Sequence, residues 1–74
     1  MSLALAEIAE ARFQTSPYPP LRKISCEDQQ GILILRGHVQ TFFYKQMAQA
    51  AVADIEGVRE VKNEIEVFDD DRGE

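Results

Sequence analysis

The chain has little of the material from which most catalytic and metal sites are built. Its 74 residues include one cysteine, Cys26, and one histidine, His38. A single cysteine excludes an internal disulfide, and one Cys with one His cannot assemble a zinc site. We therefore expect no bound metal and no cofactor.

Positive charge is also scarce. Eight Lys and Arg residues stand against 13 Asp and Glu residues, which gives a formal net charge of −5. Nucleic acids are held mainly by Lys and Arg that neutralise phosphates, so this balance argues against a nucleic-acid partner. It also disfavours a purely electrostatic attachment to anionic lipid, although a local basic or apolar patch remains able to act.

Long apolar runs are missing as well. No run of 18 apolar residues is present, and no charged segment followed by an apolar one marks a secretion signal. What is there is an ordinary globular composition, 45% apolar and 28% charged, at a length near the lower limit for one unaided core. We expect a single domain over residues 4–68 and a disordered acidic tail over residues 69–74.

The N-terminal segment predicts a helix. Apolar side chains at Leu5, Ile8 and Ala9 recur at helical spacing, which indicates a helix over residues 3–14. Three prolines within residues 17–20 end it, because proline removes backbone donors and disfavours the α conformation before it.

A β-hairpin is predicted next. Alternation over residues 21–28 indicates a half-buried strand, Gln29-Gln30-Gly31 a turn, and residues 32–39 a second strand. A register that gathers four apolar side chains on one face fixes the pairing. That register pairs Asp28 with Gly31, Cys26 with Leu33 and Ile24 with Leu35.

The last third predicts a second helix and a third strand. The helix is expected over residues 42–56, with Thr41 or Gln40 as its N-cap and Gly57 as the glycine that ends it. Its buried stripe comprises Tyr44, Ala48, Ala51, Val52 and Ile55. The strand over residues 58–68 places on one face Val61, Asn63, Ile65 and Val67.

These elements define an α+β fold in the order α-β-β-α-β. Both helices must cover the apolar face of a three-stranded mixed sheet, since nothing else in the chain can. The result is a two-layer sandwich, with the last strand parallel to the second because a helical crossover joins them.

Three spaced motifs carry a resemblance to a known family. They are Gly31-x-Leu33-x-Leu35-x-Gly37-x-Val39-x-Thr41, then Lys45-x-x-Ala48, then Gly57-Val58-x-x-Val61-x-Asn63-x-Ile65-x-Val67. In this ordered combination the chain resembles the BON domain over residues 5–68, a family whose fold is α-β-β-α-β.

The resemblance implies a non-enzymatic binding module. BON domains occur in bacterial osmotic-stress proteins of the periplasm, in outer-membrane lipoproteins and beside other envelope modules, and phospholipid contact is commonly proposed for them. The family therefore implies a periplasmic or envelope location, while the lack of a signal in this chain leaves the cytoplasm open.

No catalytic residue is predicted. Gly31, Gly37 and Gly57 are interpreted as a turn, a close packing point and a helix end, and Asn63 as a hydrogen-bonding partner of the backbone. In the expected register Cys26 is a core residue, and His38 lies on the other face of the sheet, so the two form no nucleophile–base pair.

One candidate surface lies at the start of the second helix. Phe42 and Phe43 point away from the buried stripe, beside Lys45 and near Met47 at its margin. Either the rings fold over the neighbouring helix and complete the core, or they insert at a membrane interface or form a protein contact.

The open face of the sheet is the second candidate. Ile32 and Ile34 lie there next to Arg36, and branched side chains exposed on a sheet favour self-association or docking. Scattered exposed apolar residues are the alternative. The charged residues expected around them are Lys23, Glu60, Lys62 and Glu64.

Two functional hypotheses follow from these surfaces. The first is a module for protein interaction or self-association, favoured by the acidic charge and the isoleucine pair. The second is a phospholipid- or envelope-binding domain, favoured by the family and by Phe42 and Phe43.

Overall fold

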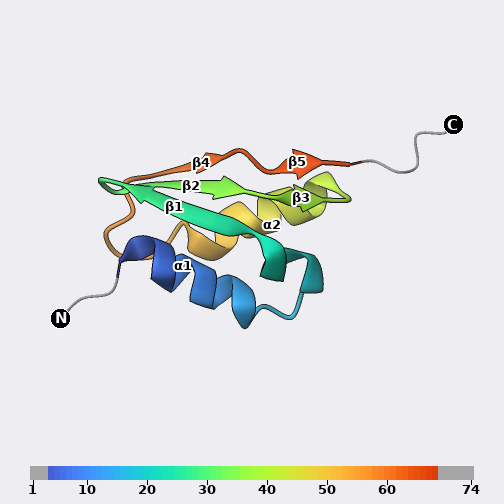
Figure 1. Cartoon of the computed structure of the whole chain (residues 1–74), viewed down its shortest axis with the longest axis horizontal. Coiled ribbons are helices and arrows are strands. Elements are labelled where there is room, and N and C mark those ends of the chain that lie inside the picture. Colours follow the sequence, from blue (N-terminus) through green and yellow to red (C-terminus); the bar gives the residue numbers. More distant parts are fainter. Residues whose placement is uncertain (1–3, 69–74) are drawn as a thin grey trace, which may run out of the picture.

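The computed structural model describes residues 4–68. Its elements are α1 (Leu5–Gln14), the 3₁₀ helix η1 (Pro19–Lys23), β1 (Ser25–Gln29), β2 (Ile32–Arg36), β3 (His38–Val39), α2 (Phe42–Val52), β4 (Glu60–Asn63) and β5 (Glu66–Val67). The predicted α+β fold is confirmed: two helices pack on a mixed sheet of order β1-β2-β4 (Figure 1). The tail over residues 69–74 lies outside the described residues.

The proline-rich segment forms a short helix before the first strand begins. Pro19 and Pro20 occupy the first positions of η1, where the fixed φ of proline suits a helix and its missing N–H is not needed. The strand expected over residues 21–28 therefore begins only at Ser25. Leu21, on η1, is held in the core with 1% of its surface exposed.

β1 and β2 pair antiparallel, but the expected register is wrong by two residues. The turn consists of Gln30 (φ 57°) and Gly31 (φ 94°), and two successive residues with positive φ form the tight turn that suits a two-residue hairpin. Asp28 Oδ1 accepts a hydrogen bond from Gly31 N at 3.0 Å and closes it. A shift of two leaves every side chain on its predicted face. The observed pairs are Ser25–Arg36, Cys26–Leu35, Glu27–Ile34, Asp28–Leu33 and Gln29–Ile32.

The third strand runs parallel to the second, as predicted, but both long strands are interrupted. β2 gives way to β3 at Gly37, and β4 to β5 at Glu64 and Ile65. Asn63 explains the second break, because its Oδ1 accepts the Ile65 N–H at 3.2 Å. The strands stay together across the break, since Glu64 N donates to Leu35 O at 2.9 Å and β3 pairs with β5 in parallel.

α2 ends at Val52, four residues before the predicted end. There the Arg12 guanidinium on α1 donates from Nη1 to Ala51 O at 3.0 Å and to Asp54 Oδ1 at 2.6 Å. It thus satisfies a carbonyl of the last turn that a longer helix would bond internally. Gly57 is not the residue after the helix: it lies in the following turn, with φ +100° that other residues rarely adopt.

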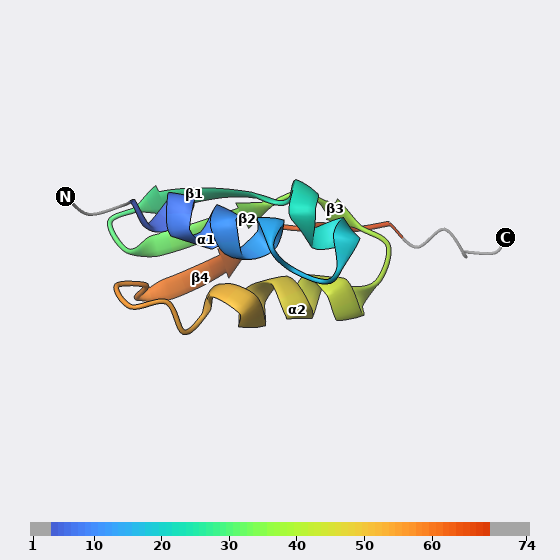
Figure 2. The ribbon, with the colours of Figure 1, turned by 90° about the horizontal axis from the view of Figure 1, so that it is seen from below.

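The two helices lie side by side over one face of the sheet (Figure 2), and the core lies between them and that face. The stripe predicted for the second helix is confirmed, with Ala48 and Val52 fully buried. The predicted hydrogen bonding of Asn63 is also confirmed, since its Nδ2 donates to Lys45 O at 3.0 Å and ties α2 to β4. The buried core comprises Ala9, Phe13, Leu21, Ile24, Leu33, Leu35, Val39, Ala48, Val52, Ile55 and Ile65.

Candidate binding surface

Two phenylalanines begin α2 and face solvent. Thr41 is the N-cap, as predicted, and its Oγ1 accepts a hydrogen bond from Tyr44 N at 3.2 Å. With this start fixed and Ala48 turned inward, helical geometry directs Phe42 and Phe43 outward. They expose 60% and 56% of their surfaces, so neither is a core residue.

Phe43 belongs to a cluster of three rings. Its centroid lies 6.2 Å from that of Tyr18 on the segment before η1 and 5.5 Å from that of Tyr44, both in edge-to-face geometry. Tyr18 and Tyr44 lie 5.9 Å apart. Such edge contacts restrict the ring of Phe43 and leave most of its surface exposed.

The outward face of α2 is almost free of charge. Between Phe42 and Ala53 the only charged residue is Lys45, which is half-buried, in a chain that is 28% charged. Met47 is half-buried and packs against the core. We call this face the α2 surface; its exposed members are Phe42, Phe43, Gln46, Gln49, Ala50 and Ala53.

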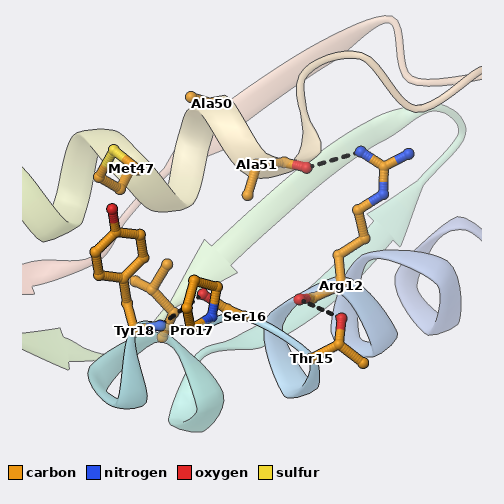
Figure 3. A pocket seen from close by; sticks show the side chains of 9 residues that line it. Arg12, Thr15, Ser16, Pro17, Tyr18, Met47, Ala50 and Ala51 are labelled. Carbon is orange, nitrogen blue, oxygen red and sulfur yellow. Dashed lines mark hydrogen bonds between the residues drawn. The ribbon is translucent and has the colours of Figure 1, made fainter.

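A groove runs along one side of the α2 surface, between α2 and the end of α1 (Figure 3). Its volume is about 440 Å³, which lies within the range of small ligand and peptide sites. The walls are largely apolar, and Arg12 closes the end near the last turn of α2. The lining residues are Arg12, Thr15, Ser16, Pro17, Tyr18, Leu21, Met47, Ala50 and Ala51.

A second aromatic feature lies at β3 and β5. Phe68 exposes 51% of its surface and stacks against His38, with ring centroids 4.8 Å apart. His38 Nε2 lies 3.6 Å from Glu66 Oε1. A hollow of about 350 Å³ beside this pair is lined by Pro19, Pro20, Lys23, His38, Val39, Gln40 and Phe68.

Comparison with protein families matches residues 3–68, nearly the whole chain, to the BON domain. The chain belongs to the BON domain family. The resemblance read from the glycine-spaced motifs is thereby confirmed, and with it the broad class of binding module. No curated protein matches the chain.

The open face of this BON domain differs from its prediction. Ile34 is buried, with 5% of its surface exposed, and Ile32 is half-buried, so the isoleucine pair forms no exposed apolar patch. Arg36 bridges this face: its Nη1 lies 2.6 Å from Glu27 Oε1 and its Nε 3.3 Å from Glu64 Oε1. Ile34 pairs with Glu27 on β1 and with Lys62 on β4, and such neighbours on both sides are not revealed by alternation within one strand.

The two groups with catalytic potential lie on different strands, Cys26 on β1 and His38 on β3. Burial, and to a lesser extent Glu10, raises the pKa of the Cys26 thiol to about 12, so the thiol is protonated at neutral pH. Within residues 4–68 no group of three His, Cys, Asp or Glu side chains is placed to hold a metal ion. In the same residues, no helix has the length and apolar character needed to span a membrane.

The structure keeps the residues predicted at the start of the second helix together and removes the exposed apolar patch predicted on the open sheet face. Phe42 and Phe43 lie together on the α2 surface, with Lys45 and Met47 at its margins. Tyr18 and Phe68 were missed. Tyr18 carried a signal, since an aromatic ring inside a proline-rich turn has few ways to be buried, whereas Phe68 ends an alternating pattern that suggests an ordinary strand residue.

Proposed function

We propose that this BON domain is a non-catalytic module that binds another protein through the α2 surface. The observation that carries the proposal is the pair of exposed rings, Phe42 and Phe43, beside an apolar groove on a face that is almost uncharged. Exposed aromatic groups next to a preformed groove are the features that distinguish the centre of a protein interface from ordinary surface.

Rigidity supports this proposal. The edge contacts of Phe43 with Tyr18 and Tyr44, and the hydrogen bonds of Asn63 to α2, fix the helix and the ring before a partner arrives. A pre-ordered surface loses less conformational entropy on binding than a mobile one. Catalysis is not part of the proposal, because the BON domain is a family of binding modules.

Site-specific photocrosslinking in the source cells tests the proposal. A photoreactive phenylalanine analogue at position 43 is expected to give a discrete protein adduct, and the same analogue at Lys62, on the open sheet face, is expected to give none. Equal adducts from both positions, or none from position 43, would remove the α2 surface as the docking site.

Phospholipid binding is the second candidate, and one observation favours it. Phe42 is the most exposed large apolar side chain of the described residues, and it lies one turn from Lys45. Aromatic rings that enter the acyl boundary beside a lysine at headgroup level form a common interfacial anchor. The net charge of −5 weighs against attraction to anionic lipid.

Co-sedimentation with vesicles separates the two candidates. Neutral phosphatidylcholine vesicles and vesicles with added phosphatidylserine are each mixed with the wild-type chain and with the Phe42→Ser/Phe43→Ser variant. Under the protein-binding proposal neither vesicle carries the chain down. Sedimentation of the wild type that the double substitution abolishes would support the lipid candidate instead.

A further inference from the structure

We infer that the partner of the α2 surface is a second copy of this chain, with the two α2 helices packed antiparallel about a two-fold axis. This inference rests on the proposed function and makes it specific. Three independent properties of the surface lead to it: its charge, the distribution of large and small side chains along it, and the position of the groove.

Charge selects the face on which two copies can meet. Each chain carries a net charge of −5, so two copies repel unless the facing surfaces lack negative charge. On the open sheet face, Arg36 forms ion pairs with Glu27 and Glu64 of the same chain. Its positive charge is therefore already paired within that chain. The α2 surface has no acidic residue from Phe42 to Ala53, so it is the face that allows close approach.

Side-chain size sets the direction of the pair. The large residues of the α2 surface, Phe42 and Phe43, lie at its start, and the small residues, Ala50 and Ala53, lie at its end. A parallel arrangement would place phenylalanine against phenylalanine and leave the alanines facing a gap. An antiparallel arrangement places each phenylalanine against the alanines of the other copy, where large and small side chains interdigitate.

The groove then receives Phe43. A two-fold axis perpendicular to the two helices keeps the α1 side of one α2 next to the α1 side of the other. Phe43 and the groove residues Met47 and Ala50 lie on that same side, as their helical spacing and the groove lining show. Phe43 of each copy therefore meets the groove of the other, and the contact is made twice, as in an isologous interface.

The remaining charges complement each other in the same arrangement. Lys45 lies near the start of α2, whereas Glu56 follows its end. Spacing of about 100° per residue puts Lys45 on the flank of the helix away from the groove, while Glu56 is exposed in the turn that follows the helix. Antiparallel pairing brings the helix start that carries Lys45 in one copy toward the turn that carries Glu56 in the other, and the opposing helix dipoles add a small favourable contribution.

The expected dimer is reversible. One exposed helix face on a domain with a total accessible surface of 5022 Å² gives an interface at the small end of those seen in specific complexes. Interfaces of that size accompany transient association. We expect a dissociation constant on the order of tens of micromolar.

Sedimentation equilibrium of the 74-residue chain tests the association. The wild type is expected to change from monomer to dimer as its concentration rises through the micromolar range. Phe42→Ser/Phe43→Ser should raise the dissociation constant at least about ten-fold, because the two rings are the largest apolar groups of the proposed interface. The matched control is Phe68→Ser, an exposed ring outside the α2 surface, which should leave it unchanged. Monomer at every concentration, or equal effects of the two variants, would overturn the inference.

Cysteine trapping tests the direction of the helices. In a Cys26→Ser background, a Gln46→Cys chain is mixed with a chain that carries Ala50→Cys. Antiparallel pairing about residue 48 predicts disulfides between the two different chains. Parallel pairing predicts disulfides within each kind, 46 with 46 and 50 with 50, and that result would exclude the proposed arrangement. A Lys62→Cys chain serves as the control for random collision.

The two proposals fail separately. A monomeric wild type that still gives a protein adduct from position 43 in cells would end the self-association inference and leave the α2 surface as a docking site for a different protein. A dimer that is insensitive to Phe42 and Phe43, together with no adduct from position 43, would remove both.

Discussion

Cys26 lies on β1 next to α1, and its backbone N–H donates to Oε2 of Glu10 on that helix at 3.1 Å. The thiol is half-buried, and the neighbouring carboxylate disfavours a second negative charge. Both effects favour the protonated form, which is the less nucleophilic form of the thiol.

The thiol should therefore react slowly in the folded protein. The pKa of about 12 predicts that a disulfide reagent such as Ellman's reagent labels native Cys26 at pH 8 far more slowly than it labels the chain in 6 M guanidinium. Equal rates would show that the thiol is accessible and ionised. A free cysteine measured in both solvents corrects for the effect of the denaturant on the reagent.

The raised pKa of Cys26 also makes the free energy of unfolding depend on pH. The folded pKa is raised from 9.0 to about 12, so above pH 9 the unfolded chain loses the thiol proton while the folded chain keeps it. The contribution of this group to stability is complete below pH 9 and is lost as pH rises toward 12. Replacing Cys26 with Ser should flatten that part of the stability profile.

At the scale of elements, the start of α2 determines where the exposed rings point. Thr41 provides the only side-chain cap at the N-termini of the two α-helices in residues 4–68, since Ala4 at the start of α1 has no capping oxygen. Loss of the cap frees the N–H of Tyr44 and loosens the first turn, which carries both phenylalanines.

Thr41→Ala is expected to lower the free energy of unfolding by about 1 kcal/mol, the usual value for an N-cap hydroxyl. Chemical denaturation followed by circular dichroism measures the change. Thr41→Ser keeps the accepting oxygen and should remain within a few tenths of a kcal/mol of wild type. A full loss in the serine variant would assign the effect to the threonine methyl group and not to the cap.

Element types were predictable from the sequence, and element ends were less so. Periodicity identified both helices and all three long strands, because the buried faces repeat at 3.6 and 2 residues. The end of α2 depends on Arg12, 39 residues away from Ala51 in the chain, and the strand breaks depend on single polar contacts such as that of Asn63. Such contacts leave no periodic signal in the sequence.

Only part of the candidate surface could be predicted from the sequence, and the reason is related. Helical spacing alone directs Phe42 and Phe43 outward, so that part followed from the sequence. Ile34 is buried on a strand that has a neighbour on each side, and the ring of Tyr18 reaches Phe43 because η1 packs against α2. Both facts require the tertiary arrangement.

At the scale of the whole molecule, apolar side chains divide into two groups with separate roles. Phe13 on α1 is fully buried at the centre of the core, whereas Phe42 and Phe43 contribute most of their surface to solvent. A domain of 74 residues has few large side chains, and using two of them outside the core limits its stability. The proposed docking of a partner at the α2 surface would account for this placement.

This division predicts opposite outcomes for two phenylalanine substitutions. Phe13→Ala removes a buried ring and should cost about 3–5 kcal/mol, comparable with the whole stability of a domain of this size, so the chain should be largely unfolded at 37 °C. Phe42→Ala should shift the thermal midpoint by no more than a few degrees while it weakens association. Thermal unfolding followed by circular dichroism measures both. A large loss of stability in Phe42→Ala would mean that its ring belongs to the core, and the case for the α2 surface as a docking site would lose its main support.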